Sequence, residues 1–132
     1  MANRLYPITG KAIWDAFGIL STAIKVSLID TGTYTYSDSH DFYADLSGVT
    51  ADSAALSTKS TTDGVFDADD ATFSSVSGAV SEALIIWMDT TNSATSPIIL
   101  YLDTSVTGLP ATPIGGDIIV QWNASGIMEI SL

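Results

Sequence analysis

The stretch from Glu82 to Asp103, EALIIWMDTTNSATSPIILYLD, constrains the fold more than any other part of the chain. Two short apolar runs, 83–88 and 98–102, flank a polar segment, 89–97, whose residues favour turns, and this predicts a β-hairpin with a long tip. Successive side chains of a strand point to opposite faces, and here both faces are apolar in both runs. Such strands lie in the middle of a sheet that is covered on both sides, so other segments have to supply two covers.

Three further segments alternate between apolar and polar residues, which is typical of strands with one buried face. Segment 23–30 predicts a half-buried strand that ends at a turn. Segments 117–122 and 127–132 predict a second hairpin around the turn residues 123–126. The side chains expected to face inward are Ile24, Val26, Leu28, Ile118, Val120, Trp122, Met128, Ile130 and Leu132, with Lys25 and Ser27 facing outward.

Helical signals are short. Segment 10–17, GKAIWDAF, predicts a helix of about two turns, because Thr9 can cap its start and Gly18 can end it. A helix this short is unstable alone in water, so we expect it to lie against the outer face of the central hairpin, with Trp14 or Phe17 as its anchor.

The middle of the chain gives weaker signals. SHDFYADL, 39–46, predicts a short helix capped by its first serine. Segment 47–78 is rich in Ser, Thr, Asp and Gly, and it predicts only a weak strand around 54–56 and short strands at 65–66 and 72–73.

These segments predict a mainly β chain that forms a single domain over residues 1–132. The expected architecture is an antiparallel β-sandwich, jelly-roll-like, with one or two short helices packed on it. Segment 1–20 is expected to form the short helix or a docking arm. Ser and Thr together supply 33 of the 132 residues, which suits strands and turns better than long helices.

The charge is strongly negative, with fifteen acidic residues against four basic ones and a net charge of −11. Three of the bases, Arg4, Lys11 and Lys25, lie in the first 25 residues. Nucleic-acid binding depends on Lys and Arg that replace counterions, so this composition argues against a nucleic-acid partner. The acidic body either serves solubility or meets a basic partner surface.

Cysteine is absent, which excludes disulfides, thiolate metal sites and cysteine nucleophiles. The start of the chain lacks the basic region and long apolar stretch of a signal peptide. The longest aliphatic run is far shorter than the roughly 20 residues that span a bilayer. We therefore expect a soluble protein that is made in the cytoplasm and has no membrane partner.

Three features that offer chemistry also have simpler interpretations. The acidic segment 63–70 fails the calcium-loop pattern, since Ala71 stands where an oxygen ligand is needed, and a solvated turn is favoured. His40 has neighbouring serines and acids, but no G-x-S-x-G motif accompanies it. Packing is favoured over a carbohydrate platform for the three tryptophans, Trp14, Trp87 and Trp122. We predict no catalytic residue, metal ligand or cofactor, and no enzymatic activity.

Several segments taken together resemble a family of small structural proteins of tailed bacteriophages. They are MANRLYPITGKAIWDAF, AIKVSLIDTGTYTY, SHDFYADL, TDGVFDADDATFSSVSG, EALIIWMDT, ATSPIILYLDT and TGLPATPIGGDIIVQWNASGIMEISL. The resemblance covers almost the whole chain, and the second half carries it best.

The resemblance implies a non-enzymatic virion protein that is synthesised in the host bacterial cytoplasm. A capsid decoration or cement protein ranks first, a homo-oligomer, with a trimer favoured, that binds the major capsid protein or other virion proteins. A neck, tail or fibre-adaptor component ranks second. A carbohydrate-binding module that uses the exposed aromatic residues Tyr34, Tyr36 and Tyr43 is an alternative from another class.

Partner contacts are expected in three places, the segment 4–11 and the polar loops 89–97 and 107–116. Trp87 falls on a strand pattern typical of core, but an exposed Trp87 would mark a neighbour's binding surface. The candidate contact residues are Arg4, Leu5, Tyr6, Lys11, Trp87, Asn92, Pro97, Leu109 and Pro110.

Overall fold

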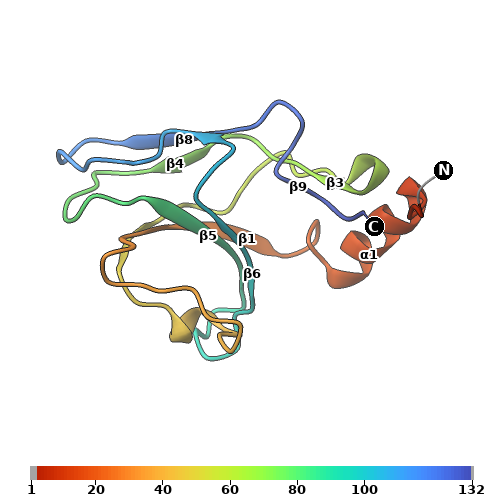
Figure 1. Cartoon of the computed structure of the whole chain (residues 1–132), viewed down its shortest axis with the longest axis horizontal. Coiled ribbons are helices and arrows are strands. Elements are labelled where there is room, and N and C mark those ends of the chain that lie inside the picture. Colours follow the sequence, from red (N-terminus) through yellow and green to blue (C-terminus); the bar gives the residue numbers. More distant parts are fainter. Residues whose placement is uncertain (1–2, 132) are drawn as a thin grey trace.

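The structure is a computed structural model that describes residues 3–131. It is mainly β, as predicted, with 33% strand against 13% helix in three antiparallel sheets and one α-helix (Figure 1). The helical elements are α1 (Pro7–Phe17) and the one-turn 3₁₀ helices η1 (Tyr43–Asp45) and η2 (Thr62–Gly64). The strands are β1 (Ala23–Ile29), β2 (Val49–Asp52), β3 (Val65–Phe66), β4 (Ala71–Phe73), β5 (Ala83–Asp89), β6 (Ile98–Leu102), β7 (Val106–Thr107), β8 (Ile118–Trp122) and β9 (Met128–Glu129).

The predicted central hairpin is confirmed as β5 and β6, which belong to a four-stranded sheet of order β2-β1-β5-β6. The first five residues of β5 are buried, as expected for an interior strand. β6 lies at the edge of this sheet and its residues are half-buried. The two-sided apolar pattern therefore marks a central strand in β5 only, because β6 is bounded by a single neighbour.

One face of this sheet is covered by the sheet β4-β8-β7, which lies above it in Figure 1. Phe73 and Val120, both fully buried, come from the covering sheet and share one core with the residues of β1 and β5 that face them. The predicted inward residues of β1 and β8 all belong to this core: Ile24, Val26, Leu28, Ile118, Val120 and Trp122.

The opposite face is covered by the chain between β1 and β2, and not by the N-terminal helix as predicted. Tyr34 and Leu46 of this covering segment pack on Ile29, Ala83 and Ile85. Of the helix predicted over 39–46, only the one-turn η1 forms. The backbone is still extended at Phe42 and becomes helical only from Tyr43. The Asp45 carboxylate accepts the backbone N–H groups of the two residues that precede this turn, at 2.9 and 3.0 Å, and so fixes its start.

Helix α1 begins three residues earlier than predicted, because Pro7 takes the first helical position, where its fixed φ fits and no N–H is needed. Gly18 ends the helix in the left-handed conformation, as expected. The buried face consists of Gly10 and Trp14, whose indole Nε1–H donates to the Gly64 carbonyl at 2.9 Å. The helix therefore docks on η2 at one end of the molecule, away from the face it was expected to cover (Figure 1).

The predicted second hairpin is wrong. β8 pairs with β4 and β7, whereas β9 pairs with β3 in a separate two-stranded sheet. Both edges of β8 are occupied, so the chain that leaves it has to find another partner. Met128 is exposed rather than inward, and Leu132 lies outside the described residues.

The short strands predicted at 65–66 and 72–73 are confirmed as β3 and β4. The weak strand expected around 54–56 is instead β2, a few residues earlier. Beyond β2 the chain stays alongside β1, since the backbone N–H of Leu56 donates to the Ile24 carbonyl at 2.7 Å.

Candidate functional site

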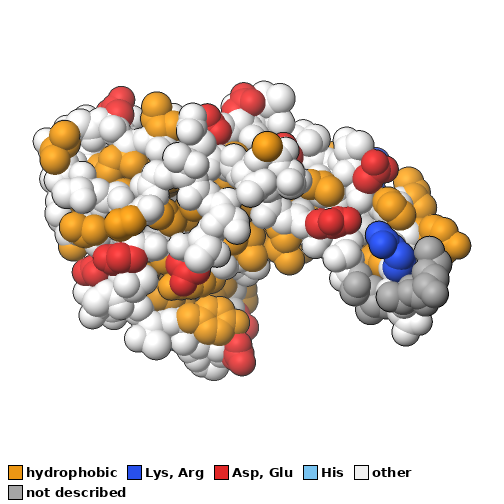
Figure 2. Space-filling model, turned by 45° about the horizontal axis from the view of Figure 1, so that its top comes forward, with side chains coloured by type: hydrophobic (Ala, Val, Ile, Leu, Met, Phe, Trp, Pro, Cys, Tyr) orange, Lys and Arg blue, Asp and Glu red, His pale blue; other side chains and the backbone are white. Residues whose placement is uncertain are grey.

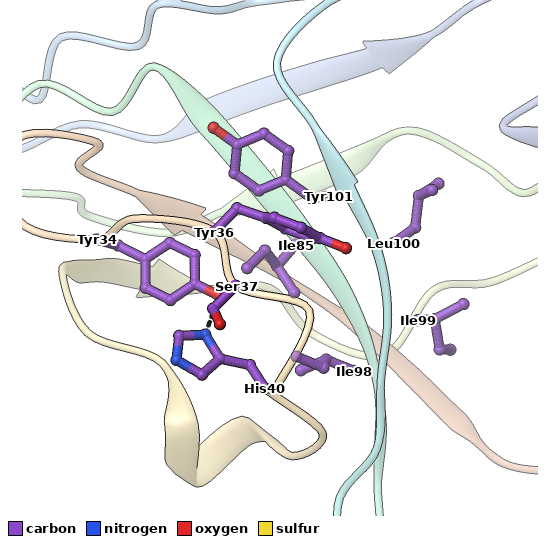
Figure 3. A pocket seen from close by; sticks show the side chains of 9 residues that line it. All are labelled: Tyr34, Tyr36, Ser37, His40, Ile85, Ile98, Ile99, Leu100 and Tyr101. Atoms are coloured by element: carbon purple, nitrogen blue, oxygen red, sulfur yellow. Dashed lines mark hydrogen bonds between the residues drawn. The ribbon is translucent and has the colours of Figure 1, made fainter.

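A pocket of about 120 Å³ opens between the covering segment and the edge strand β6 (Figure 3). We call it the tyrosine pocket, because three of its nine lining residues are tyrosines. The lining residues are Tyr34, Tyr36, Ser37, His40, Ile85, Ile98, Ile99, Leu100 and Tyr101. Sequence reasoning named Tyr34, Tyr36 and Tyr43 as a glycan platform but did not join Tyr101 to them, since Tyr101 lies on a distant segment, and it considered His40 only for catalysis.

The tyrosine pocket has one fixed wall and one exposed wall. Tyr34 is buried and its hydroxyl lies 2.8 Å from His40 Nδ1; burial, followed by the charge of Asp45, raises the pKa of Tyr34. Tyr36 is 57% exposed, stands edge-on to Tyr101 with ring centroids 5.9 Å apart, and donates its hydroxyl proton to an Asp38 carboxylate oxygen at 2.7 Å. The exposed wall therefore presents aromatic surface to solvent.

A polar network beside the pocket holds the covering segment on the sheet. The Trp87 Nε1–H donates to Ser27 Oγ at 2.9 Å, Ser27 donates to an Asp52 carboxylate oxygen, and Tyr43 donates to the other oxygen at 2.8 Å. The Tyr43 ring also packs on Trp87, with centroids 4.3 Å apart. Burial, with the Asp52 hydrogen bond, raises the pKa of Tyr43 to about 12.

This network changes two expectations. Ser27, predicted to face outward, is fully buried on the face of the main sheet that the chain between β1 and β2 covers, where it accepts the Trp87 hydrogen bond. Trp87 is only 6% exposed, so its side chain is not part of the molecular surface. Trp87 is therefore buried, as its strand pattern predicts, and it is not the exposed residue that would mark a partner surface.

Acidic residues lie near several residues that line the tyrosine pocket, and none of the four basic residues lines it. Asp38 is bound to Tyr36, the charge of Asp45 acts on Tyr34, and Glu82 and Asp103 act on Tyr101. Asp41 follows His40, and its carbonyl accepts the Ile98 N–H at 3.0 Å. We call these five residues, Asp38, Asp41, Asp45, Glu82 and Asp103, the acidic rim.

The second candidate surface is the N-terminal arm, residues 3–20. Trp14 and Ile19 of the arm are buried, but five of its other large apolar side chains are exposed to between 41% (Leu20) and 79% (Tyr6): Tyr6, Ile8, Ile13, Phe17 and Leu20. On the face drawn in Figure 2, the Lys and Arg side chains lie at the end that carries the N-terminus, while Asp and Glu side chains occur on all parts of the face, this end included. The arm is thus an apolar, locally basic projection on an acidic molecule.

The four contact candidates of this arm differ in their surroundings. Tyr6 is exposed, whereas Arg4 and Leu5 line a groove of about 290 Å³ together with Glu129 and neighbouring residues. Lys11 forms a 2.8 Å ion pair with Asp15, which lowers the pKa of that carboxyl group. Lys11 is therefore partly neutralised within the chain.

The remaining candidates lie on two loops. Asn92 organises the tip of the central hairpin, where its carbonyl accepts a bond from the Thr95 N–H at 3.0 Å, and Pro97 forms a bridge with Phe42. Leu109 packs against the main core, so only Pro110 of that pair is exposed. The structure brings neither loop together with the N-terminal arm.

Other chemistry finds little support in the part of the chain that the structure describes. Residues 3–131 contain no group of three or more His, Cys, Asp or Glu side chains that could hold a metal ion. In the acidic segment 63–70, the Asp69 carboxylate accepts the hydroxyls of Ser57 and Thr58 at 3.1 and 2.8 Å. No helix within these residues has the length and apolar character needed to cross a membrane.

No protein-family model matches the chain, and no curated protein matches it significantly.

Proposed function

We propose that the protein is a non-enzymatic structural subunit of a bacteriophage virion and that it binds neighbouring proteins through its N-terminal arm. One observation carries this proposal: of the eleven large hydrophobic side chains that are exposed among the described residues, five lie in this one segment of 18 residues. Exposed apolar side chains gathered in one place mark interaction sites. The resemblance of the sequence to small tailed-phage proteins supplies the virion setting.

Within the virion, capsid decoration ranks first. A decoration protein binds the major capsid protein as an oligomer, for which a trimer is favoured, and its jelly-roll-like sandwich would serve as a rigid spacer. The alternative is a neck, tail or fibre-adaptor component. An acidic body with an apolar arm suits a subunit that gains stability from its neighbours.

The carbohydrate-binding alternative loses weight on the geometry of its own residues. Tyr34 is buried, and Tyr43 packs on Trp87 in the polar network. Tyr36 is the one tyrosine of the three that is exposed. A flat platform for a sugar ring needs aromatic faces turned to solvent, and a single exposed ring offers little area.

The test is quantitative mass spectrometry of purified phage particles that carry the wild-type gene or Ile13→Ser and Phe17→Ser substitutions in the arm. Decoration predicts copy numbers on the order of hundreds, whereas about a dozen or fewer indicates the neck or tail. The arm variants are expected to be lost from particles although they fold. Absence of the wild-type protein from particles would refute the virion role.

A further inference from the structure

We propose that the N-terminal arm of one copy docks in the tyrosine pocket of a second copy, with the Tyr6 side chain as its anchor. The inference rests on the proposed function, because it names the partner that the arm binds. Tyr6 is 79% exposed, the largest exposure among the aromatic side chains of the described residues. Its ring is left uncovered by its own chain and is therefore accessible to a second molecule.

The size and chemistry of the tyrosine pocket fit one aromatic ring. Its volume is about 120 Å³, and apolar cavities of roughly 150 Å³ bind benzene. Ile85 and Ile98 supply an apolar floor, while Tyr36 and Tyr101 offer ring faces and edges to an entering ring. Ser37 and His40 lie among the lining residues, where they offer hydrogen-bond partners to a tyrosine hydroxyl.

Charge selects the arm over other exposed apolar residues. Arg4 lies two residues from Tyr6, the sequence from Asn3 to Lys11 contains no acid, and Arg4 forms no salt bridge within the described chain. The acidic rim places negative charge near the pocket, with Asp38 bonded to Tyr36 and with Glu82 and Asp103 near Tyr101. Ile114 is even more exposed than Tyr6, at 89%, but its loop contains no basic residue. Opposite charges on the two surfaces favour the arm.

The contact has to form between copies. The indole of Trp14 ties α1 to Gly64 and so holds the arm at one end of the molecule, while the tyrosine pocket lies beside β6 in the body (Figure 1). Each copy presents one arm and one pocket, which are different surfaces. The resulting interface is head-to-tail, and it closes into a ring or extends into a filament.

The experiment measures self-association by sedimentation velocity for the wild type, for the arm variant Tyr6→Asp and for the pocket variant Tyr36→Asp. Both side chains are exposed, so we expect both variants to fold, as near-UV circular dichroism will show. The wild type is expected to associate with concentration, more strongly at low salt. Each variant is expected to weaken association about thirtyfold, the effect of losing an aromatic anchor.

Mixing the two variants gives the decisive result. The arm variant keeps an intact pocket and the pocket variant keeps an intact arm, so the mixture is expected to form a one-to-one dimer that grows no further. Ile114→Asp is the matched control, with the same change at an exposed apolar site, and is expected to associate like the wild type. The milder variants Arg4→Gln and Asp38→Asn test the same two surfaces should an aspartate disturb folding.

Three results would overturn the inference: a wild type that stays monomeric, a mixture that stays as monomeric as its components, or a control that weakens association as much as Tyr6→Asp. A monomeric wild type whose Tyr6→Asp variant is lost from phage particles would leave the proposed function standing and assign the arm to a different virion protein.

Discussion

Gly10→Ala is the sharpest test of how the N-terminal arm is attached, because two physical effects predict opposite signs. A Cβ atom built at Gly10 meets the Ile130 carbonyl oxygen at 2.9 Å and the Gly64 Cα at 3.2 Å. Both neighbours are backbone atoms, so neither can move aside as a flexible side chain would. The helix has to shift away from η2 and from the chain after β9.

The magnitude follows from the two effects. Alanine is about 1 kcal/mol more favourable than glycine inside a helix, which by itself predicts stabilisation. Overpacking a tight contact costs about 1 to 3 kcal/mol. We expect the steric cost to exceed the helical gain, with a net loss of about 1 kcal/mol in the docking of α1. Gly64→Ala should cost more, since Gly64 also adopts a positive φ of 82°.

The docking of α1 is measured by hydrogen exchange of the Trp14 indole N–H, which is bonded to the Gly64 carbonyl, and global stability by urea unfolding. We expect this proton to exchange faster in Gly10→Ala than in the wild type, and the urea midpoint of the variant to be lower. Thr9→Ala at the exposed neighbouring position is the control and should not speed exchange. A Gly10→Ala variant that is more stable than the wild type, with unchanged protection of the indole, would refute the close contact.

Three more predictions concern the second face of the main sheet. Tyr43 has a folded-state pKa raised from 10.0 to about 12, so its contribution to stability is complete below pH 10 and is lost as the pH rises toward 12. In Tyr43→Phe, the urea midpoint of unfolding should fall less over this pH range than it does in the wild type. Trp87→Phe removes the donor to the buried Ser27 hydroxyl and should lower the free energy of unfolding by about 1 to 3 kcal/mol, measured by thermal denaturation. The backbone N–H groups of Phe42 and Asp41 lower the pKa of Asp45, so the contribution of Asp45 to stability is present at neutral pH and is lost as the pH falls through that lowered pKa. Asp45→Asn should therefore weaken the acid dependence of unfolding measured by circular dichroism. An unchanged pH profile would contradict the assigned role.

The sequence predicts β1, β5 and β6 of the main sheet because the apolar pattern along a strand reports its burial directly. β1 alternates between apolar and polar residues, β5 is apolar on both faces, and both strands lie inside the sheet. The covers were harder to predict. The chain between β1 and β2 has weak local propensity, and it is held by long-range bonds that no periodicity reveals, such as the one from the Tyr43 N–H to the Ser96 carbonyl at 2.8 Å.

Helix α1 shows a different limit of sequence reasoning. The helix predicted over 10–17 is expected to use Trp14 or Phe17 as its anchor, yet Phe17 is exposed together with Ile13 and Leu20. The docked face is chosen by Gly10, whose missing side chain allows backbone contact, and by the hydrogen bond of Trp14. Hydrophobic periodicity finds an apolar face but does not tell whether the protein's own core or another molecule covers it.

The tyrosine pocket could be predicted only in part. Tyr34 and Tyr36 stand out in the sequence as aromatic residues near polar ones. They line one pocket with Tyr101 only because the covering segment folds back over β6, which is a property of the tertiary structure. The acidic rim has the same origin, because residues from three segments supply its carboxylates.

The contact of Gly10 with Gly64 and Ile130 also orders events during synthesis. The arm is made about 120 residues before Ile130, so the backbone that receives it is complete only after Ile130 has followed. Until then the docking surface of the helix consists of η2 without the Ile130 backbone. During synthesis the apolar side chains of the arm are therefore open to wrong associations and to chaperones.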